Sequence, residues 1–212
     1  MSDKYKLTDE TREASGIKLF RIQALRSFGY INAGDLGGWV EGVKNLSQEG
    51  DAWVSGDAWV FGDAQVRGNA QVFGDAWVSG DAWVFGDAQV HGNAQVFGDA
   101  RVSRNAQVFG NALVSGNAQV YGDAWVYGNA QVFGNANLEK TPIYIQGRRY
   151  WIGYCGEPGY IRSGCEYHTI SWWLENVEDC AKENGYTETE QREYRLHVCH
   201  IVAWMRLYGL DK

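Results

Sequence analysis

Proline, cysteine and long apolar stretches are scarce in this sequence, and each shortage excludes a class of protein. Only 2 of the 212 residues are Pro and 4 are Cys, and no run of eighteen apolar residues occurs. Without such a run, and without a charged-then-apolar leader, we expect neither a membrane span nor a secretory signal. The four cysteines fall in the last third with no CxxC spacing, which predicts reduced thiols in a cytoplasmic protein.

Basic residues are scarce in the middle of the chain. The formal net charge is −7, and residues 50–137 contain eight Asp against three Arg. A surface that follows a nucleic-acid backbone needs the opposite balance of charge. We therefore expect no nucleic-acid polymer as a partner.

A six-residue repeat fills that middle segment. From Gly50 to Asn137 the phrase Gly-Asp/Asn-Ala-x-Val-x recurs about fourteen times without an insertion. Ala-x-Val-x alternates as a strand does, with Ala and Val on one side and the variable residues on the other. Gly followed by Asp or Asn is typical of a turn. Strands this short cannot form long hairpins, so the pattern predicts a coil whose turns stack on one another.

The inward residues predict a triangular coil of three hexads, about eighteen residues long. The pattern resembles the hexapeptide-repeat left-handed β-helix family, in which an aliphatic residue is followed four places later by a small one, as in Val54 with Ala58 and Val60 with Ala64. Left-handedness is what this resemblance implies. The predicted fold is mainly β: a single-stranded left-handed parallel β-helix with an N-terminal cap and a small C-terminal domain of β-strands and two helices.

The chain divides into three predicted parts. Residues 1–49 form a cap and an irregular first coil, with strands at Lys4–Leu7 and Leu19–Leu25; residues 50–137 form the β-helix; residues 138–212 form the tail domain. A cap is expected because an open coil end exposes unpaired strand edges. The opening phrases KYKLT, LFRIQAL and AGDLGGWVE resemble uncharacterised bacterial and prophage β-helix proteins.

The tail changes character. Short strands are predicted at residues 143–145, 150–154 and 160–162, then a helix at Ser171–Glu183 that ends at Asn184-Gly185. A second helix opens with a capping box from Thr187 to Glu190. Its apolar stripe is expected at Tyr194, Val198, Ile201, Val202, Met205 and Tyr208. The phrase from Gly164 to Trp173 resembles small tails of uncharacterised phage-encoded proteins.

Two details of the repeat bear on single residues. Residues 50–73 and 74–97 are the same 24-residue sequence except that Arg67 is replaced by His91. Since the hexad is what is copied, we predict that His91 is an exposed, dispensable side chain. Arg104 stands where neighbouring hexads have Gly, which predicts that this turn position does not require a positive φ everywhere.

Catalytic and metal sites are not predicted. The resemblance to hexapeptide-repeat acyltransferases implies a coil histidine beside a loop that breaks the repeat, but the repeat has no such loop and His91 is its only histidine. Acyltransferase activity stays an alternative. The carbonic-anhydrase branch of the family is excluded, because it needs three metal-binding histidines near the coils and the repeat has one. Cys165 with His168, Cys199 with His200, and a column of Asp63, Asp81 and Asp99 invite metal binding. Packing and turn hydrogen bonds explain them better, and Asn replaces Asp in that column from Asn117 onward, so we predict no metal and no cofactor.

Outward aromatic residues predict self-association. At eighteen-residue spacing, one face collects Trp59, Phe61, Trp77, Phe97, Leu113 and Phe133. A second face collects Trp53, Phe73, Phe109, Trp125 and Tyr127, and the third has Trp83, Phe85 and Tyr121 with Arg67 and Arg101. Two apolar faces exceed what a soluble monomer exposes, so we expect another copy or the tail to cover them. The first face is the predicted interface of a dimer or trimer; scattered, tolerated aromatics are the alternative.

A ligand site is predicted in the tail. Arg148, Arg149 and Arg162 can pair with phosphates, and Tyr150, Tyr167 and His168 can stack on a planar group. The leading hypothesis is a non-enzymatic, oligomeric binding protein. Because the sequence resembles phage-encoded proteins, we expect the protein to act in the host cytoplasm against a defence system. It would sequester an anionic nucleotide-like signal or block a host protein. A purely structural element is the first alternative.

Overall fold

The structure is a computed structural model that describes residues 3–14 and 16–212, with Gln146 described by its backbone alone. The chain forms two compact units, Met1–Thr141 and Pro142–Lys212. Each unit is described below by itself.

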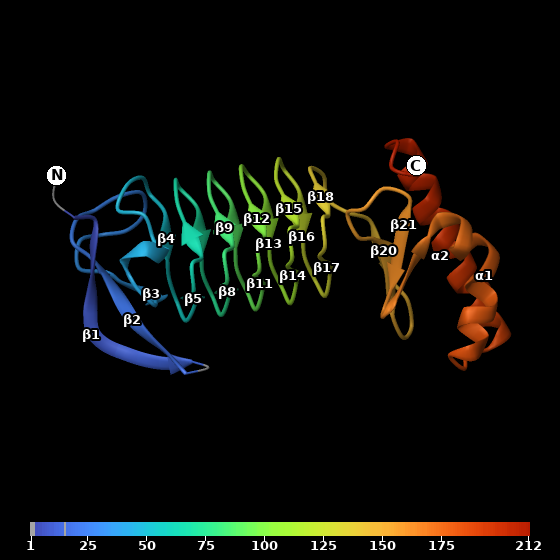
Figure 1. Cartoon of the computed structure of the whole chain (residues 1–212), viewed down its shortest axis with the longest axis horizontal. Helices are drawn as coiled ribbons and strands as arrows, with labels where there is room; N and C mark the ends of the chain where they lie inside the picture. The colour runs from blue at the N-terminus through green and yellow to red at the C-terminus, as the bar shows by residue number, and fades with distance from the viewer. Residues whose placement is uncertain (1–2, 15) are drawn as a thin grey trace. The chain divides into compact units, whose positions relative to one another are not determined.

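The first unit is a three-sided parallel β-solenoid, as predicted, and its short strands stack as successive rungs (Figure 1). The first face contains β3 (Leu36–Val40), β5 (Trp59–Val60), β8 (Trp77–Val78), β11 (Gln95–Val96), β14 (Leu113–Val114) and β17 (Gln131–Val132). The second contains β4 (Trp53–Val54), β7 (Gln71–Val72), β10 (Gln89–Val90), β13 (Gln107–Val108) and β16 (Trp125–Val126). The third contains β6 (Gln65–Val66), β9 (Trp83–Val84), β12 (Arg101–Val102), β15 (Gln119–Val120) and β18 (Asn137–Leu138).

The register confirms the coil length and the side-chain alternation. Trp59 pairs with Trp77 and Val60 with Val78, so equivalent residues lie eighteen positions apart. The repeat alanines and valines are buried, most of them with no exposed surface, while Trp77 outside the coil is 39% exposed. The interior is therefore built from the two invariant small and β-branched positions, and the variable residues cover its outside.

Each hexad turns through a residue in the left-handed backbone region. The repeat glycines have φ between +65° and +73°, and Arg104 has φ of +59°, the one positive φ at a non-glycine residue among the described positions. The prediction that this position tolerates a negative φ is wrong. The turn geometry is imposed by the stacked coils, so Arg104 adopts a conformation that costs a side-chain-bearing residue free energy.

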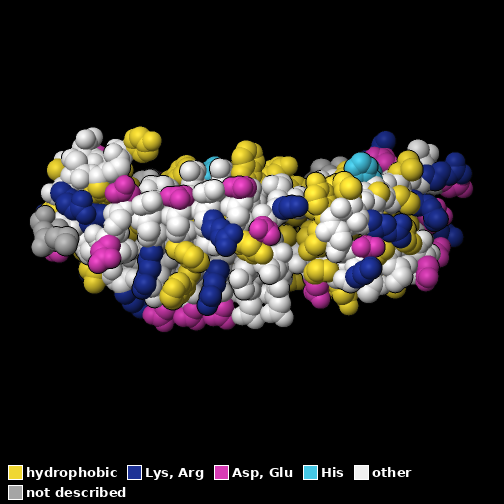
Figure 2. Space-filling view, turned by 90° about the horizontal axis from the view of Figure 1, so that it is seen from above, with side chains coloured by type: hydrophobic (Ala, Val, Ile, Leu, Met, Phe, Trp, Pro, Cys, Tyr) yellow, Lys and Arg dark blue, Asp and Glu magenta, His cyan; other side chains and the backbone are white. Residues whose placement is uncertain are grey.

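The turn side chains form ladders along the solenoid. Asn69 Nδ2 donates to Asp87 Oδ1 at 3.0 Å, and Asn105 Nδ2 donates to Asp123 Oδ1 at 2.9 Å, in each case one coil on. Figure 2 also shows acidic side chains in a row along one edge of the solenoid. In the described part of the chain, no group of three or more His, Cys, Asp or Glu side chains is arranged to hold a metal ion.

An antiparallel hairpin caps the first coil. Strands β1 (Tyr5–Ala14) and β2 (Ile17–Ala24) are longer than predicted, and β2 continues the first face by pairing with β3. A short 3-10 helix, η1 (Val43–Asn45), completes the first coil. The hairpin thus covers the strand edge that an open solenoid end would expose (Figure 1).

Two side chains before and within β1 satisfy the backbone of that coil. Lys4 is fully buried, and its Nζ donates to the carbonyl oxygen of Ala52 at 2.8 Å and, at longer range, to those of Glu49 and Gly50. The Tyr5 hydroxyl donates to the carbonyl oxygen of Leu46 at 2.7 Å. The cap is therefore held by polar contacts to carbonyls of the first coil, which have no preceding coil whose N–H groups could bond to them.

The second unit is a four-stranded antiparallel sheet with two helices. Its strands, in spatial order, are β19 (Tyr144–Gln146), β20 (Trp151–Tyr154), β21 (Tyr160–Ser163) and β22 (Glu166–Thr169). Helix α1 (Ile170–Glu183) and helix α2 (Glu188–Leu207) follow, and the predicted capping box of Thr187 and Glu190 is present. Strand β22 was not predicted. The predicted stripe of α2 is buried except at Tyr208, which is 44% exposed.

No helix in the described ranges combines the length and the apolar character needed to cross a membrane.

Candidate functional site

The first solenoid face carries the residues predicted to form an oligomer interface. Trp59, Trp77 and Leu113 share one column of partners, and Phe61, Phe97 and Phe133 follow the valines of the same strands. Trp77 and Phe97 are more than a third exposed, whereas Trp59 is half-buried because Arg12 of the hairpin lies over its ring. The indoles of Trp59 and Trp77 stack with centroids 4.9 Å apart.

The second face is covered more than the sequence indicates. Trp53 is 1% exposed because Tyr5 and Phe28 of the cap pack against its ring. Further along, Phe73, His91 and Phe109 form a ladder of parallel rings spaced by 4.6 Å and 5.0 Å. His91 is therefore a half-buried member of an aromatic stack, which corrects the prediction of an exposed side chain.

His91 also lacks the partners of a general base. No hydrogen bond or ion pair of its ring is recorded among residues 3–14 and 16–212, and its ring contacts are phenyl rings. Burial lowers the pKa of His91. Desolvation disfavours the charged imidazolium, and no carboxylate among the described residues bonds to the ring.

On the third face, arginines lie over the aromatic residue predicted there. The guanidinium carbons of Arg67 and Arg101 lie 5.2 Å and 5.8 Å from the ring of Trp83. Arginine on indole is thus a recurrent contact on this solenoid.

In the tail, the three predicted arginines are bonded to protein groups. Arg148 Nε pairs with Glu193 Oε2 at 2.9 Å. Arg149 donates from both terminal nitrogens, at 3.0 Å, to the carbonyl oxygens of Asn184 and Gly185 at the end of α1. Arg162 Nε donates to the carbonyl oxygen of Gly164 at 2.8 Å.

Of the predicted stacking residues, Tyr167 lies beside Arg162, its partner across β21 and β22, whereas His168, the next residue, faces the other side of the sheet. The Tyr167 hydroxyl bonds to Glu157, and His168 bonds to Glu166 at 2.7 Å and stacks on Trp172. Among the six predicted ligand residues, Tyr150 lines a cavity.

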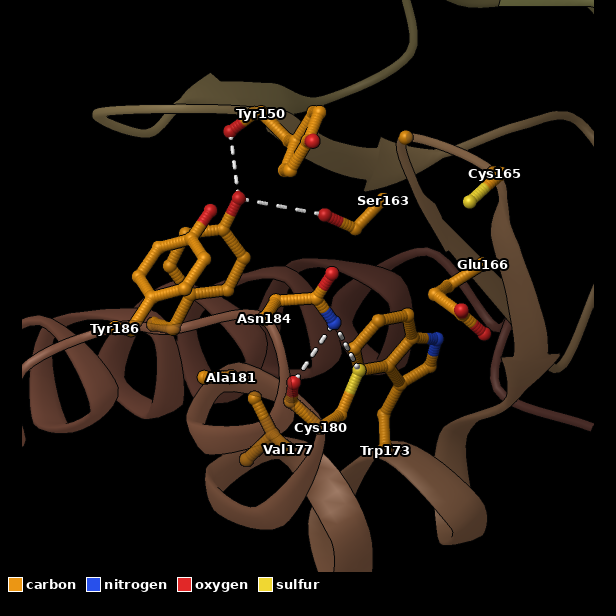
Figure 3. A pocket seen from close by; sticks show the side chains of 12 residues that line it. Tyr150, Ser163, Cys165, Glu166, Trp173, Val177, Cys180, Ala181, Asn184 and Tyr186 are labelled. Atoms are coloured by element: carbon orange, nitrogen blue, oxygen red, sulfur yellow. Dashed lines mark hydrogen bonds between the residues drawn. The ribbon is translucent and has the colours of Figure 1, made fainter.

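That cavity lies between the sheet and helix α1. It has a volume of about 200 Å³ and a mostly apolar lining. Figure 3 shows Ser163 and Glu166 on the sheet side and Trp173, Val177 and Cys180 on the helix side. Trp173 is fixed in place, since its Nε1 donates to the carbonyl oxygen of Ile161 at 2.8 Å. Helix α1 is held against the sheet at this point, so one stripe of the helix forms the cavity floor.

Three aromatic hydroxyl-bearing side chains close the opposite end. The Tyr194 hydroxyl donates to the carbonyl oxygen of Tyr150 at 2.7 Å and lies 3.4 Å from Ser163 Oγ. The Tyr186 hydroxyl is buried beside that of Tyr194 and forms no hydrogen bond of normal geometry among the described residues. Arg149 holds this end together, because its guanidinium lies 4.6 Å from the Tyr186 ring while it bonds to the end of α1.

The thiols of the tail are unpaired, as predicted. Burial raises the pKa of Cys155, and burial together with the nearby Glu166 raises the pKa of Cys180, which lines the cavity. Thiolate is the nucleophilic and metal-binding form of cysteine. Cys180 therefore offers the cavity packing surface rather than a reactive thiolate.

Sequence reasoning missed most of this cavity. The helix was predicted, and the spacing of Trp173, Val177 and Ala181 could have indicated its buried stripe. Tyr186 sits in the turn between the helices and gives no such signal. Its buried hydroxyl and the void beside it arise from how the sheet, the turn and both helices pack.

The solenoid, and not the tail, is what comparison with known proteins relates to other chains. Residues 94–108, 106–122 and 118–134 match a family described as YdcK Beta solenoid repeat. The three matches lie within residues 94–134 and support a β-solenoid repeat, the coarser part of the resemblance drawn from the sequence. The comparison with curated proteins finds no match.

Proposed function

We propose that this protein is a non-enzymatic binding protein whose tail cavity takes a small, uncharged, planar ligand. The observation that carries the proposal is the cavity of about 200 Å³ with the buried hydroxyl of Tyr186 in its wall, beside the Tyr194 hydroxyl and without a hydrogen bond of normal geometry among the described residues. Small-molecule sites are concave and mostly apolar with a few placed polar groups, and this cavity has that composition. A buried hydroxyl without a well-formed hydrogen bond costs free energy that a ligand can recover by bonding to it.

The size of the cavity selects one or two fused rings. An apolar protein cavity of about 150 Å³ is large enough for benzene, and this one is somewhat larger. Burial raises the pKa of Tyr186, so its hydroxyl is a neutral hydrogen-bond donor. A ring system with one acceptor atom, such as a phenol, matches these features, and indole matches the size of the cavity.

An anionic nucleotide is a poorer match for this cavity. Arg148 and Arg149 are bonded to Glu193 and to the end of α1, and Glu166 contributes a carboxylate to the lining. A phosphate would have to displace these bonds or lie near the carboxylate. We therefore propose an uncharged ligand in place of the phosphate-bearing one that the tail sequence favours.

Calorimetric titration with phenol, indole and adenosine 5′-monophosphate tests the proposal. Phenol or indole should bind, and the nucleotide should not. Ala181→Leu fills the cavity from α1 and should abolish binding, whereas Ala203→Leu makes the same change on the exposed side of α2 and should leave it intact. The absence of heat from either ring compound, or equal binding by Ala181→Leu, would refute the proposal.

Tyr186→Phe separates the hydroxyl from the cavity. Removing a buried hydroxyl that has no well-formed hydrogen bond should raise the free energy of unfolding of the ligand-free protein by about 1 kcal/mol. The same change should weaken binding of phenol, which can accept from the hydroxyl, more than binding of toluene, which cannot. A loss of stability in the ligand-free variant would mean that the hydroxyl is already bonded.

Self-association is a second proposal, and it is supported by the exposed Trp77 and Phe97 on the first solenoid face. A phage or prophage origin, a counter-defence role and a host protein as partner rest on the sequence resemblance alone. This origin, role and partner are compatible with a binding protein, but they do not bear on which ligand the cavity takes.

A further inference from the structure

The first solenoid face carries its own arginine recognition contact. Arg12 of β1 lies with its guanidinium carbon 4.6 Å from the Trp39 ring and 5.8 Å from the Trp59 ring. Its Nη1 pairs with Asp57 Oδ1 at 3.1 Å. A guanidinium stacks on indole and pairs with a carboxylate better than an ammonium does. The contacts of Arg12 therefore show that the indole and carboxylate groups on this face can hold a guanidinium.

The first solenoid face has the same pair of groups once more. Trp39, Trp59 and Trp77 are successive partners in the sheet, and Asp75 precedes Trp77 as Asp57 precedes Trp59. No ion pair of Asp75 and no cation over Trp77 occurs among the residues that the structure describes. Trp77 is 39% exposed. One coil beyond Arg12, the carboxylate and the indole are thus present without a cation.

A groove of about 400 Å³ joins the occupied and the vacant positions. Arg12 and Asp57 lie at one end, and Trp59, Asp75 and Trp77 line the middle. At the other end the repeat changes to Asn93 and Gln95, whose amide oxygens can accept hydrogen bonds but carry no charge. The groove therefore contains one pair of a carboxylate and an indole, Asp75 and Trp77, that Arg12 does not contact.

We propose that this groove binds the guanidinium of an arginine side chain from another protein, stacked on Trp77 and paired with Asp75. The formal net charge of −7 favours a cationic partner. A lysine would lose the planar stacking and the paired N–H groups. This site lies in the solenoid unit and does not depend on the tail cavity.

Ligand-observed NMR measures the binding of N-acetyl-L-argininamide as the probe. The control is N-acetyl-L-citrullinamide, which has nearly the same shape but no charge. The arginine probe should bind in the millimolar range, as a single small contact allows. The citrulline probe should show no binding, and N-acetyl-L-lysinamide should bind more weakly than the arginine probe.

Replacements that the repeat itself uses keep the coil intact. Asp75→Asn and Trp77→Gln introduce the residues found one coil on, at Asn93 and Gln95, and each should weaken the arginine probe about fivefold or more. Asp99→Asn removes the same charge from a turn outside the groove and should have no effect. Arg12→Gln vacates the first position and should raise the amount of probe bound at saturation.

Three results would overturn the proposal. They are equal binding of the citrulline probe, an unchanged affinity in both Asp75→Asn and Trp77→Gln, and no binding of the arginine probe at tens of millimolar. An Arg12→Gln variant that binds no additional probe would show that Arg12 does not occupy an equivalent position.

Discussion

The imidazole of His91 stacks on the ring of Phe109 with centroids 5.0 Å apart and planes 1° from parallel. Since Phe73 stacks on the other face of the imidazole, His91 is packed as an aromatic side chain. The sequence predicts that His91→Ala changes the free energy of unfolding by no more than about 0.5 kcal/mol. Because His91→Ala removes two ring contacts, we instead expect the free energy of unfolding to fall by about 1 kcal/mol.

His91→Phe should stabilise the protein, and more so at low pH. The folded-state pKa of His91 is lowered by burial, so its contribution is fully present above the unfolded value of about 6.5 and is lost as the pH falls below it. Thermal midpoints at pH 7.5 and 5.5 measure this. His91→Arg, which restores the residue of the first copy, is the control and should lack the gain. A gain for Phe that is the same at both pH values would contradict the titration argument.

Arg104→Gly should stabilise the solenoid. Arg104 has φ of +59°, and relief of the left-handed conformation is worth roughly 1–2 kcal/mol. The contact of its guanidinium with Tyr121 is lost in exchange, which offsets about 0.5–1 kcal/mol. The net gain, measured by chemical denaturation, should be about 0.5–1 kcal/mol.

Gly98→Ala is the matched opposite change. Gly98 has φ of +68°, and a Cβ there would lie 3.0 Å from the backbone nitrogen of Gly116 in the next coil. This variant should lose about 1 kcal/mol or more. If Arg104→Gly destabilised the protein, its side-chain contacts would outweigh the strain.

Lys4→Met should loosen the cap. The ammonium bonds to carbonyl oxygens of the first coil, and their loss should cost about 1–3 kcal/mol. Lys6→Met changes an exposed neighbour on the same strand and should be nearly neutral. Hydrogen exchange of the β1 amides measures the opening of the cap. Equal protection in both variants would show that Lys4 is not needed.

The same lysine predicts a rise in stability at alkaline pH. Burial lowers the pKa of Lys4 from 10.5 to about 8, so between these values the unfolded chain holds a proton that the folded chain has released. The free energy of unfolding should therefore increase from about pH 8 to pH 10.5 on this account. Lys4→Met should lack that increase, which thermal midpoints across the range would detect.

Self-association should depend on the phenylalanine column of the first face. Ser79 and Ser115 stand in the same column as Phe61 and Phe97, so Phe61→Ser with Phe97→Ser is compatible with the coil. The wild type should sediment as a dimer or trimer and this variant as a smaller species. Phe85→Ser, on the third face, is the control. A wild-type monomer at micromolar concentration would make the prediction wrong.

The local chemistry of the hexad was sufficient to predict the solenoid. Alternation of Ala and Val with polar or aromatic residues, and a turn once per six residues, determine which side chains are buried whatever lies nearby. The capping box at Thr187 and Glu190 was also predictable, because it joins residues three positions apart. Arg104 shows the limit of such reasoning: its own side chain disfavours the turn, and the stacked coils impose it.

Candidate sites depended on contacts between distant residues. The arginine pattern of the tail predicted a phosphate site, but Arg149 instead bonds to Asn184 and Gly185, residues that lie far along the chain. Likewise Trp53 is an outward residue of the repeat that the cap buries, and Trp77 is an equivalent residue that the cap leaves exposed. Nothing in either hexad distinguishes the two.

The sequence by itself determined the coil, its period and its inside and outside, because these follow from interactions within six residues repeated many times. Tertiary structure alone decided which outward residues are covered by the hairpin, that Arg12 reaches Asp57, and that a cavity remains beside Tyr186. These features arise where elements of different sequence meet. The free energy of such contacts depends on shape and burial in three dimensions, which no local pattern of residue types specifies.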